Sequence, residues 1–263
     1  MSTTRALFIR DFLIARSYRM AVVLDLVLGL LNLLVYYFIS RTFGNPAPSD
    51  LGGAPSYFAF ASVGIAMTTV INAASAAVSG RVRQEQLTGT LEATVTQPVS
   101  SATLAAGMSG LPFLSAAVRA ALYLVLAAVI LDLDFPQADW GGAVAVLAIS
   151  GIALSSLGIL SAALVMVIKR GDVVVALGVF ALGLLGGSVF PVSVLPGWLE
   201  AIAEVVPTRF SFDGLRDALF EGTGWSGDVF VLCLFAVGLL PPALWAFAAA
   251  LRAAKRGGSI AEY

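Results

Sequence analysis

The sequence predicts an all-helical integral membrane protein, and three observations lead to this fold class. Hydrophobic residues form 59% of the 263-residue chain and charged residues only 12%, whereas soluble domains are about half apolar and about one quarter charged. The mean hydropathy is +0.94. Six apolar runs approach or exceed the roughly 20 residues that a helix needs to cross a bilayer. We therefore expect a single transmembrane domain over residues 1–263, with no separate soluble domain.

The six runs give the predicted membrane helices in chain order. The first is a membrane span rather than a signal peptide, because Arg41, Thr42 and Phe43 follow it where a cleavage site would need small residues. We expect a kink at Pro112 in the third span, since proline cannot donate the helical hydrogen bond. The predicted spans are residues 20–40, 56–79, 104–131, 140–168, 173–190 and 229–251, the last of which runs through Pro241 and Pro242.

Positive charges gather in alternate connections, and this bias predicts the orientation of the chain. Lysines and arginines lie before the first span and after the second, fourth and sixth, whereas the other connections collect most of the carboxylates. Cytoplasmic loops carry the excess of lysine and arginine. We therefore expect an even number of crossings in the cell (plasma or inner) membrane, with both termini cytoplasmic. Segment 81–98 then lies in the cytoplasm.

Several classes of function lack the residues that they require. The net charge of −1 and the scattered cations provide no basic surface for nucleic acid. With no histidine and with Cys233 as the one cysteine, the chain offers neither a disulfide nor a Cys/His metal site. It also has no G-x-x-x-x-G-K-[ST] phosphate loop, and Lys169 and Lys255 are its two lysines. We expect no cofactor on this chain, so a nucleotide-driven transporter would need a second polypeptide.

The polar segment 81–98 interrupts two apolar runs. Residues 84–87 and 90–96 each fit a short helical turn, Gly89 permits a bend between them, and Pro98 ends the segment. The segment is therefore predicted to form a bent hairpin across the cytoplasmic mouth. Charge alone would equally suit a solvated loop that returns the chain to the membrane.

The order of residues in this segment resembles a family signature. The run reads E-x-x-x-G-T-L-E-x-x-x-x-x-P and is similar to the signature of the ABC-2 family, the membrane subunits of many ABC exporters. The resemblance implies a coupling helix that docks into an ATP-hydrolysing partner subunit, which would bind the ATP and Mg. It also implies a dimer with an identical or different permease. The residues assigned to coupling are Arg81, Arg83, Glu85, Leu87, Gly89, Thr90, Leu91, Glu92 and Pro98.

The segment 191–228 is predicted to carry two short amphipathic helices. Trp198, Ile202 and Val206 fall at helical spacing, and Thr208 is positioned to cap a second helix. Neither is long enough to cross the bilayer. The alternative is a surface loop. The family resemblance, through an FP-x-x-x-LP, P-T and G-x-R pattern, implies re-entrant helices that close the outer end of the pathway. The residues assigned to this external gate are Phe190, Pro191, Leu195, Pro196, Trp198, Pro207, Thr208 and Arg216.

Two ionisable residues fall inside predicted spans, where an isolated charge is costly. Asp25 lies about one turn into the first span, and Arg119 lies near the middle of the third. The two could pair, or Asp25 could face cytoplasmic water, which its shallow depth favours. Arg119 is too deep to snorkel easily, so we expect it to face the bundle, a water-filled path or a partner subunit. Asn32 and Asn72 could form interhelical hydrogen bonds, but we interpret both as packing residues. Small residues at 73–77 and at Gly151, Ser155 and Gly158 permit close helix approach.

The function predicted from these features is that of an ATP-driven ABC-2 permease. It would move a hydrophobic or amphipathic substrate, drug or lipid-like, out of the cytoplasm or the inner leaflet. Residues 1–19 mix arginines with apolar residues and are expected to form an interfacial helix on the lipid bilayer. An ATPase-independent secondary transporter or channel is the alternative, although no internal repeat is visible. An intramembrane enzyme is less compatible, because no nucleophile or metal cluster is present.

Overall fold

The computed structural model describes residues 19–44, 51–88, 100–167 and 171–257, and within these ranges it contains helices and no strands. Eight α-helices are present there, five of which are long and apolar enough to cross a membrane. The predicted interfacial helix lies outside the described residues, apart from Arg19. The helices are α2 (Arg19–Phe43), α3 (Tyr57–Leu87), α5 (Ser101–Leu131), α6 (Trp140–Val167), α7 (Gly171–Leu185), α8 (Gly197–Ala203), α9 (Pro207–Arg216) and α10 (Trp225–Gly257).

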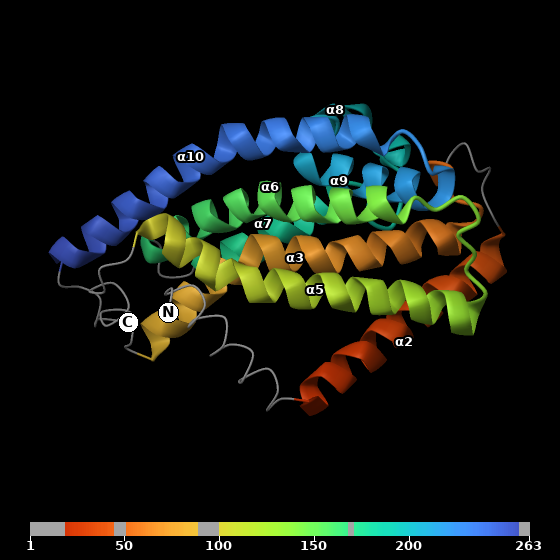
Figure 1. Ribbon diagram of the computed structural model, residues 1–263, viewed down its shortest axis with the longest axis horizontal. Helices are drawn as coiled ribbons and strands as arrows, with labels where there is room; N and C mark the ends of the chain where they lie inside the picture. The colour runs from red at the N-terminus through yellow and green to blue at the C-terminus, as the bar shows by residue number, and fades with distance from the viewer. Residues whose placement is uncertain (1–18, 45–50, 89–99, 168–170, 258–263) are drawn as a thin grey trace.

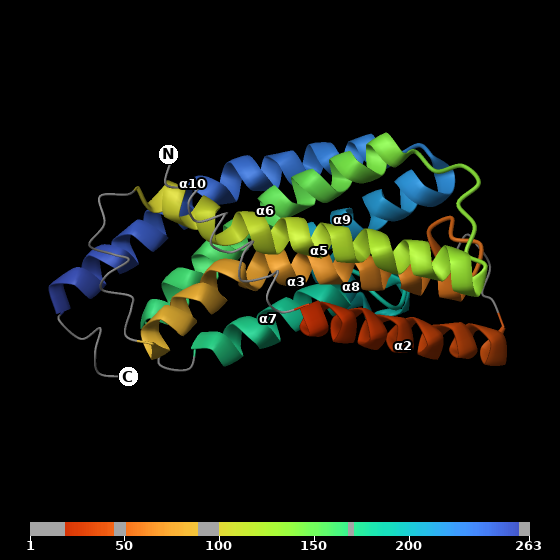
Figure 2. The ribbon, with the colours of Figure 1, turned by 60° about the horizontal axis from the view of Figure 1, so that its bottom comes forward.

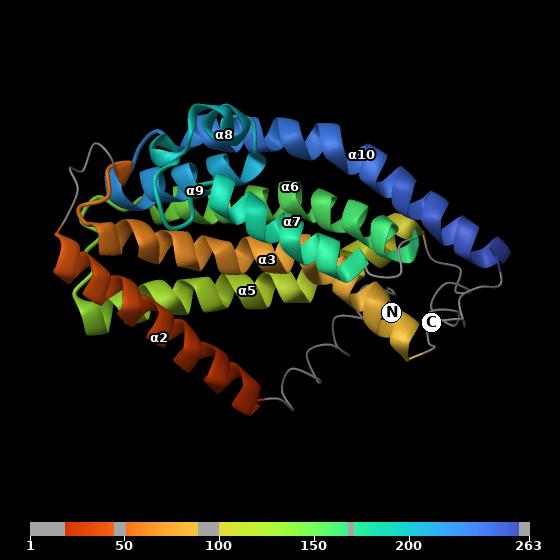
Figure 3. The same cartoon turned by 180° about the vertical axis from the view of Figure 1, so that it is seen from behind.

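The long helices form an antiparallel bundle with two distinct ends (Figure 1). At the Trp140 end, α2 and α5 stop while α3, α6 and α10 begin; the opposite end, where α3 stops, is the Arg83 end. Helix α3 is the central element and packs against α2, α5, α6, α7 and α9. Figure 2 shows α2 and α7 on one side of α3 and α10 on the other. Towards the Arg83 end α2 leaves the bundle, and its outer surface there is exposed (Figures 1 and 3).

Glycines set the closest approach between helices in the core. A Cβ atom at Gly158 of α6 would lie 2.5 Å from the Ala74 carbonyl oxygen of α3, and one at Gly151 would lie 2.0 Å from the Phe113 ring of α5. Such distances are possible only without a side chain. The prediction of close packing at these small residues is therefore confirmed. A second, smaller core of Val82, Met108 and Phe247 closes the Arg83 end.

The fifth predicted span is the element on which the structure differs most from the sequence pattern. Helix α7 has 15 residues and ends at Leu185 rather than at 190, so its length of about 22 Å is less than the roughly 30 Å hydrocarbon core. It ends there because Gly186 enters a turn in which Gly187 has φ +83°, a value that favours glycine. The chain reaches the Trp140 end through a 3₁₀ turn (Val192–Val194), α8, α9 and a π-helical turn (Asp217–Glu221).

Helices α8 and α9 do not lie beyond the ends of the long helices. All three overall views place them level with the half of the bundle nearest the Trp140 end (Figures 1, 2 and 3). Helix α9 packs against α3, α6 and α10 and buries Phe212 and Leu215 among them. The segment predicted as two short amphipathic helices therefore has that structure, with the second inserted into the bundle.

Other helix boundaries moved outward from the predicted ones. Helix α3 continues through Arg81 to Leu87, so these residues are its last turns and not a separate piece of a hairpin. Helix α5 starts at Ser101 because the Ser100 hydroxyl caps it by accepting from the Thr103 amide, and the helix continues through Pro112. Helix α10, with Pro241 and Pro242 inside it, has 33 residues and is visibly curved in Figure 1.

Candidate functional site: a two-sided cavity and its roof

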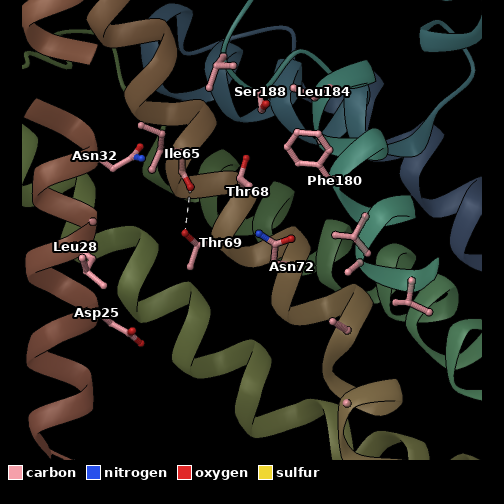
Figure 4. Close-up of a pocket in the computed structure, with 18 of the residues that line it drawn as sticks. Asp25, Leu28, Asn32, Ile65, Thr68, Thr69, Asn72, Phe180, Leu184 and Ser188 are labelled. Atoms are coloured by element: carbon pink, nitrogen blue, oxygen red, sulfur yellow. Dashed lines mark hydrogen bonds between the residues drawn. The ribbon is translucent and has the colours of Figure 1, made fainter. Parts of the chain in front are cut away.

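A cavity of about 1020 Å³ lies between α2, α3, α5 and α7 (Figure 4). It extends from Arg83 and Asp172 at one end to Ser188 and Val189 at the other. Helix α2 and helix α7 form opposite walls, and α3 runs along the back. The cavity exists because α2 diverges from the bundle while α7 stays close to α3, where it buries Gly171, Val175, Val179 and Gly183.

The two long walls of the cavity differ in polarity. Helix α3 presents Thr68, Thr69 and Asn72, whereas α7 presents Val179, Phe180 and Leu184. The threonine hydroxyls donate to carbonyls of their own helix, Thr68 to Gly64 at 2.7 Å and Thr69 to Ile65 at 3.1 Å, so their oxygens are left as acceptors. The cavity therefore offers a hydrogen-bonding face on α3 beside an apolar one on α7.

Two asparagine amides lie on this cavity without a protein partner. Asn32 of α2 and Asn72 of α3 line it, are exposed, and make no side-chain hydrogen bond to other described residues. Their interpretation as packing residues was wrong, since both face open space. An amide at membrane depth needs a partner from water or a ligand.

Asp25 and Arg119 form an ion pair beside the cavity. Their closest nitrogen and oxygen atoms are 2.9 Å apart, with side-chain exposures of 29% for Arg119 and 50% for Asp25. Of the predicted alternatives, pairing is the one the structure shows, and Asp25 also lines the cavity. Tyr123 of α5 donates to the Asp25 carbonyl at 3.1 Å. Its ring lies against Gly29, where a Cβ would be 2.3 Å away. These contacts fasten α2 to α5.

A short turn, residues 186–190, covers the cavity towards the Trp140 end; we call it the roof turn. It rests directly on α3, because a Cβ at Gly64 would lie 1.6 Å from the Ser188 carbonyl oxygen. Tyr57 of α3 donates to the Val189 carbonyl at 2.9 Å. Thr208 of α9 donates to the Leu182 carbonyl at 2.6 Å, in the last turn of α7. Thr208 therefore does not cap its own helix as predicted: Val206 precedes α9 without a side-chain cap, and Pro207 is the first helical residue.

Arg216 makes the most numerous contacts with the roof turn. Its side chain is only 2% exposed, and its guanidinium carbon lies 3.5 Å from the centre of the Phe60 ring. Its Nη2 donates to the carbonyl oxygens of Gly187 at 2.7 Å, Ser188 at 3.3 Å and Phe60 at 3.4 Å. Its Nη1 lies 3.6 Å from the Asp213 carboxylate. One cation thus joins α9, α3 and the roof turn.

Burial perturbs the charged groups around Arg216. Removal from water lowers the pKa of the Arg216 guanidinium to about 10, against the opposing effect of Asp213 and Asp217. It raises the pKa of the Asp213 carboxyl, which Arg216 and Arg209 counteract. For Asp217, burial and then the neighbouring Glu221 and Asp213 carboxylates raise the pKa to about 6. Arg216 is therefore charged at neutral pH, and Asp217 titrates close to neutrality.

The predicted coupling residues divide between described and undescribed parts of the chain. Arg81, Arg83, Glu85 and Leu87 lie on the last turns of α3, where Leu87 is 65% exposed. Arg83 also lines the end of the cavity. The remaining coupling residues, Gly89, Thr90, Leu91, Glu92 and Pro98, lie outside the described residues.

The predicted gate residues lie around the roof turn or on α8 and α9. Phe190 ends the turn and Pro191 follows it, Leu195 and Pro196 precede α8, and Trp198 on α8 is 68% exposed. Pro207, Thr208 and Arg216 belong to α9. Within this set, the side chains of Thr208 and Arg216 donate hydrogen bonds to the end of α7 and to the roof turn, respectively.

Helices, cavity and covering turn together describe a multi-pass membrane protein with a cavity between its helices. Residues 3–220 match the ABC-2 type transporter family. Because this match spans most of the 263 residues, the chain belongs to that family and is a membrane component of an ABC-2 type transporter. A comparison with curated proteins finds no match. The ABC-2 membrane domain lacks a nucleotide-binding domain, and such permeases generally pair with ABC ATPase subunits, which bind the ATP.

Some residues of the site carry no distinctive signal in the sequence pattern. Tyr57, Phe60, Gly64 and Tyr123 all lie inside apolar runs, where an aromatic residue or a glycine usually packs in the core. A tyrosine in such a run does signal one requirement, because its hydroxyl needs a hydrogen-bond partner when buried. The identity of that partner depends on the fold.

Proposed function

We propose that this chain is the permease subunit of an ATP-driven exporter and that it moves an amphipathic, drug or lipid-like molecule. The observation that carries the proposal is the cavity with one hydrogen-bonding wall on α3 and one apolar wall on α7. A molecule with polar and apolar faces satisfies both walls at once, whereas a sugar chain would leave the α7 wall uncovered. Export from the cytoplasm or the inner leaflet is the direction that the family resemblance implies.

The Arg83 end is proposed to face the cytoplasm and to receive the ATPase subunit. Lysine and arginine are concentrated in the connections at that end. Helix α3 presents Leu87 there with most of its side chain exposed, inside the segment that resembles a coupling helix. An exposed leucine that follows Arg83 and Glu85 on the same helix is a suitable anchor for a partner cleft.

The Trp140 end is then the outer end, and residues 191–228 form its re-entrant segment. The position of α8 and α9 level with the long helices supports this, because a surface loop would lie beyond them. Helix α7 with the segment that follows it completes a sixth crossing, as an even number of crossings requires.

A second permease is proposed to cover the open side of α7. That helix buries every fourth residue, from Gly171 to Gly183, and exposes Val173, Leu177 and Phe180 on its outer surface. The same side borders the cavity, so an identical or related subunit there would enclose the path between two permeases.

The test is ATPase stimulation of the complex assembled from this permease and its co-expressed ATPase. A panel of lipids, hydrophobic drugs and glycans would be compared, and amphipathic molecules should stimulate hydrolysis. Asn72→Leu should raise the half-maximal concentration about tenfold, through loss of roughly one hydrogen bond in a desolvated site. Val237→Ala, at an exposed position on α10, is the matched control.

Two further outcomes bear on the proposal. Glu92→Ala should abolish substrate stimulation while leaving the permease folded, because its position belongs to the coupling signature. Stimulation by glycans alone, or full stimulation in the Glu92→Ala complex, would contradict the substrate class or the coupling assignment, respectively.

A further inference from the structure

We propose that Arg216 is the positioning residue that holds the roof turn closed over the cavity, and that the turn opens when Arg216 leaves its carbonyl partners while Asp213 and Asp217 keep the cation paired. The proposal rests on the proposed function in one respect, namely that the cavity is the transport path. It identifies the residue that closes that path, the atoms that this residue contacts and the closed position of the roof turn.

The roof turn depends on side chains for its closed position. The consecutive carbonyls of Gly187, Ser188 and Val189 accept hydrogen bonds from Arg216 and Tyr57, and no backbone amide of the described chain donates to them. A buried carbonyl without a donor is costly. Withdrawal of Arg216 would therefore leave the Gly187 and Ser188 carbonyls without donors and favour movement of the turn.

The buried charge of Arg216 in turn depends on the roof turn for its stabilisation. A fully buried cation is tolerated only when donors and charge are satisfied. With the roof closed, its charge is stabilised by three carbonyls and by the face of the Phe60 ring at 3.5 Å. Its Nε has no partner among the described residues even then. Movement of the turn would remove two of the three carbonyls, so the closed roof and the buried cation stabilise each other.

Carboxylates next to Arg216 keep it paired when it leaves the carbonyls. Asp213 lies one helical turn before it and is its ion-pair partner with the roof closed, with 3.6 Å between Nη1 and the carboxylate, and Asp217 is adjacent in sequence. Asp213 is also held by Arg209 at 3.3 Å. A rotation of the Arg216 side chain away from the carbonyls and further towards these carboxylates keeps the cation paired in both positions. This gives the roof two discrete states rather than a graded movement.

The turn is built to move as a unit against α3. Gly64 offers the Ser188 carbonyl a surface without a side chain, and Gly187 takes a positive φ that allows the sharp reversal after α7. The Ser188 side chain is 6% exposed and lines the cavity. Position 188 therefore reports directly on closure.

The experiment measures closure through a cysteine at that position. Ser188→Cys is placed in a Cys233→Ser background, assembled with the ATPase in vesicles and exposed to a membrane-impermeant maleimide. Without nucleotide the probe at position 188 should react slowly, and during ATP turnover it should react faster. Arg216→Met should raise the nucleotide-free rate at least about tenfold, since two hydrogen bonds from a charged donor are lost. Arg216→Lys, which keeps the charge but not the planar stack, should give an intermediate rate.

Controls separate a local effect from loss of structure. Arg209→Met removes a cation from the same helix that pairs with Asp213 but does not reach the turn, and it should leave the rate near that of the native chain. A second probe, Ala162→Cys, lies fully buried in the core near the Arg83 end. It should stay protected in every variant, whereas general loosening would expose it.

The remaining outcomes are also decisive. An unchanged rate for Arg216→Met with the Ala162→Cys probe protected would overturn the proposal. If the Arg216→Met permease does not assemble with the ATPase, Tyr57→Phe is the substitute test. It removes one hydrogen bond from the roof turn and leaves every charged residue in place. An unchanged labelling rate for that variant would equally overturn the proposal. Faster labelling from the cytoplasmic side instead of the outer side would support the role of Arg216 and contradict the proposed orientation.

Discussion

Charged side chains within the bundle show what can be inferred at the scale of the residue. The pairing of Asp25 with Arg119 was one of the alternatives that depth and cost in lipid allowed, and it is confirmed at 2.9 Å. Arg216 was singled out only through the family resemblance. Its partners could not be predicted, because Phe60 is 156 residues away and Gly187 and Ser188 are 29 and 28 residues away. Such contacts depend on how the helices are arranged.

Asp217 leads to a prediction about pH. Its pKa in the folded protein is about 6, raised from 3.8 by burial and by Glu221 and Asp213. The folded state therefore binds more protons than the unfolded state between about pH 4 and pH 6, so the stability from this group falls as the pH rises through that window. Asp217→Asn should raise the thermal unfolding midpoint of the purified protein at pH 7.5 and have little effect at pH 4.5.

A neutral replacement elsewhere shows whether this effect is specific. Glu204→Gln removes one carboxylate from an exposed position at the end of α8, and its unfolding profile should run parallel to that of the native protein. Parallel profiles for Asp217→Asn and the native chain across the same range would mean that Asp217 does not contribute the expected proton linkage.

At the scale of the element, the roof turn leads to a paired prediction on α3. Gly64→Ala would place a Cβ 1.6 Å from the Ser188 carbonyl oxygen, an overlap that should destabilise the fold by about 1–3 kcal/mol. A Cβ at Gly80 of the same helix meets nothing within 4 Å, and alanine is favoured over glycine in a helix by about 0.8–1 kcal/mol. Thermal unfolding in detergent should therefore show a lower midpoint for Gly64→Ala and an unchanged or higher one for Gly80→Ala. Equal midpoints would show that the turn does not press on Gly64.

Hydropathy predicted the long helices well, because burial in lipid imposes a length and a composition on each of them. It failed at α7, where apolar residues continue to Phe190 although the helix stops at Leu185. The glycines at 186 and 187 carry the signal for that stop, but glycine is also common inside membrane helices. Because of this ambiguity, the sequence did not predict the roof turn or the cavity that the turn covers.

At the scale of the whole molecule, the arrangement of the ends is testable. Helix α10 finishes at the Arg83 end, whereas α2 begins part-way along the bundle and runs to the Trp140 end (Figure 1). Epitope tags fused to the two ends of the chain should both resist protease in right-side-out vesicles and both be cleaved in inside-out vesicles. A tag inserted next to Asp134, between α5 and α6, should show the reverse. Tags on opposite sides would contradict the even number of crossings, and reversal of all three would contradict the orientation.

The cavity is a property of the whole molecule, which explains why sequence patterns did not reveal it. Asn32 and Asn72 looked like packing residues because each is surrounded by apolar neighbours in its own helix. Their exposure follows from the divergence of α2 and from the early end of α7. The family, by contrast, was recognisable from six residues in one polar segment, because its signature is local in the sequence.

The unbroken length of α3 has a mechanical consequence. Its 31 residues contain no proline and run from Tyr57, whose hydroxyl donates to Val189 of the roof turn, to the exposed Leu87. A helix of this size is about 46 Å long, so a tilt of about 5° about its midpoint displaces each end by about 2 Å in opposite directions. A push applied at one membrane surface is thereby transmitted to the other along one continuous helix, although the last turns of α3 bend away from its axis (Figures 2 and 3). A displacement of this size at an end of α3 is large enough to break a hydrogen bond made there.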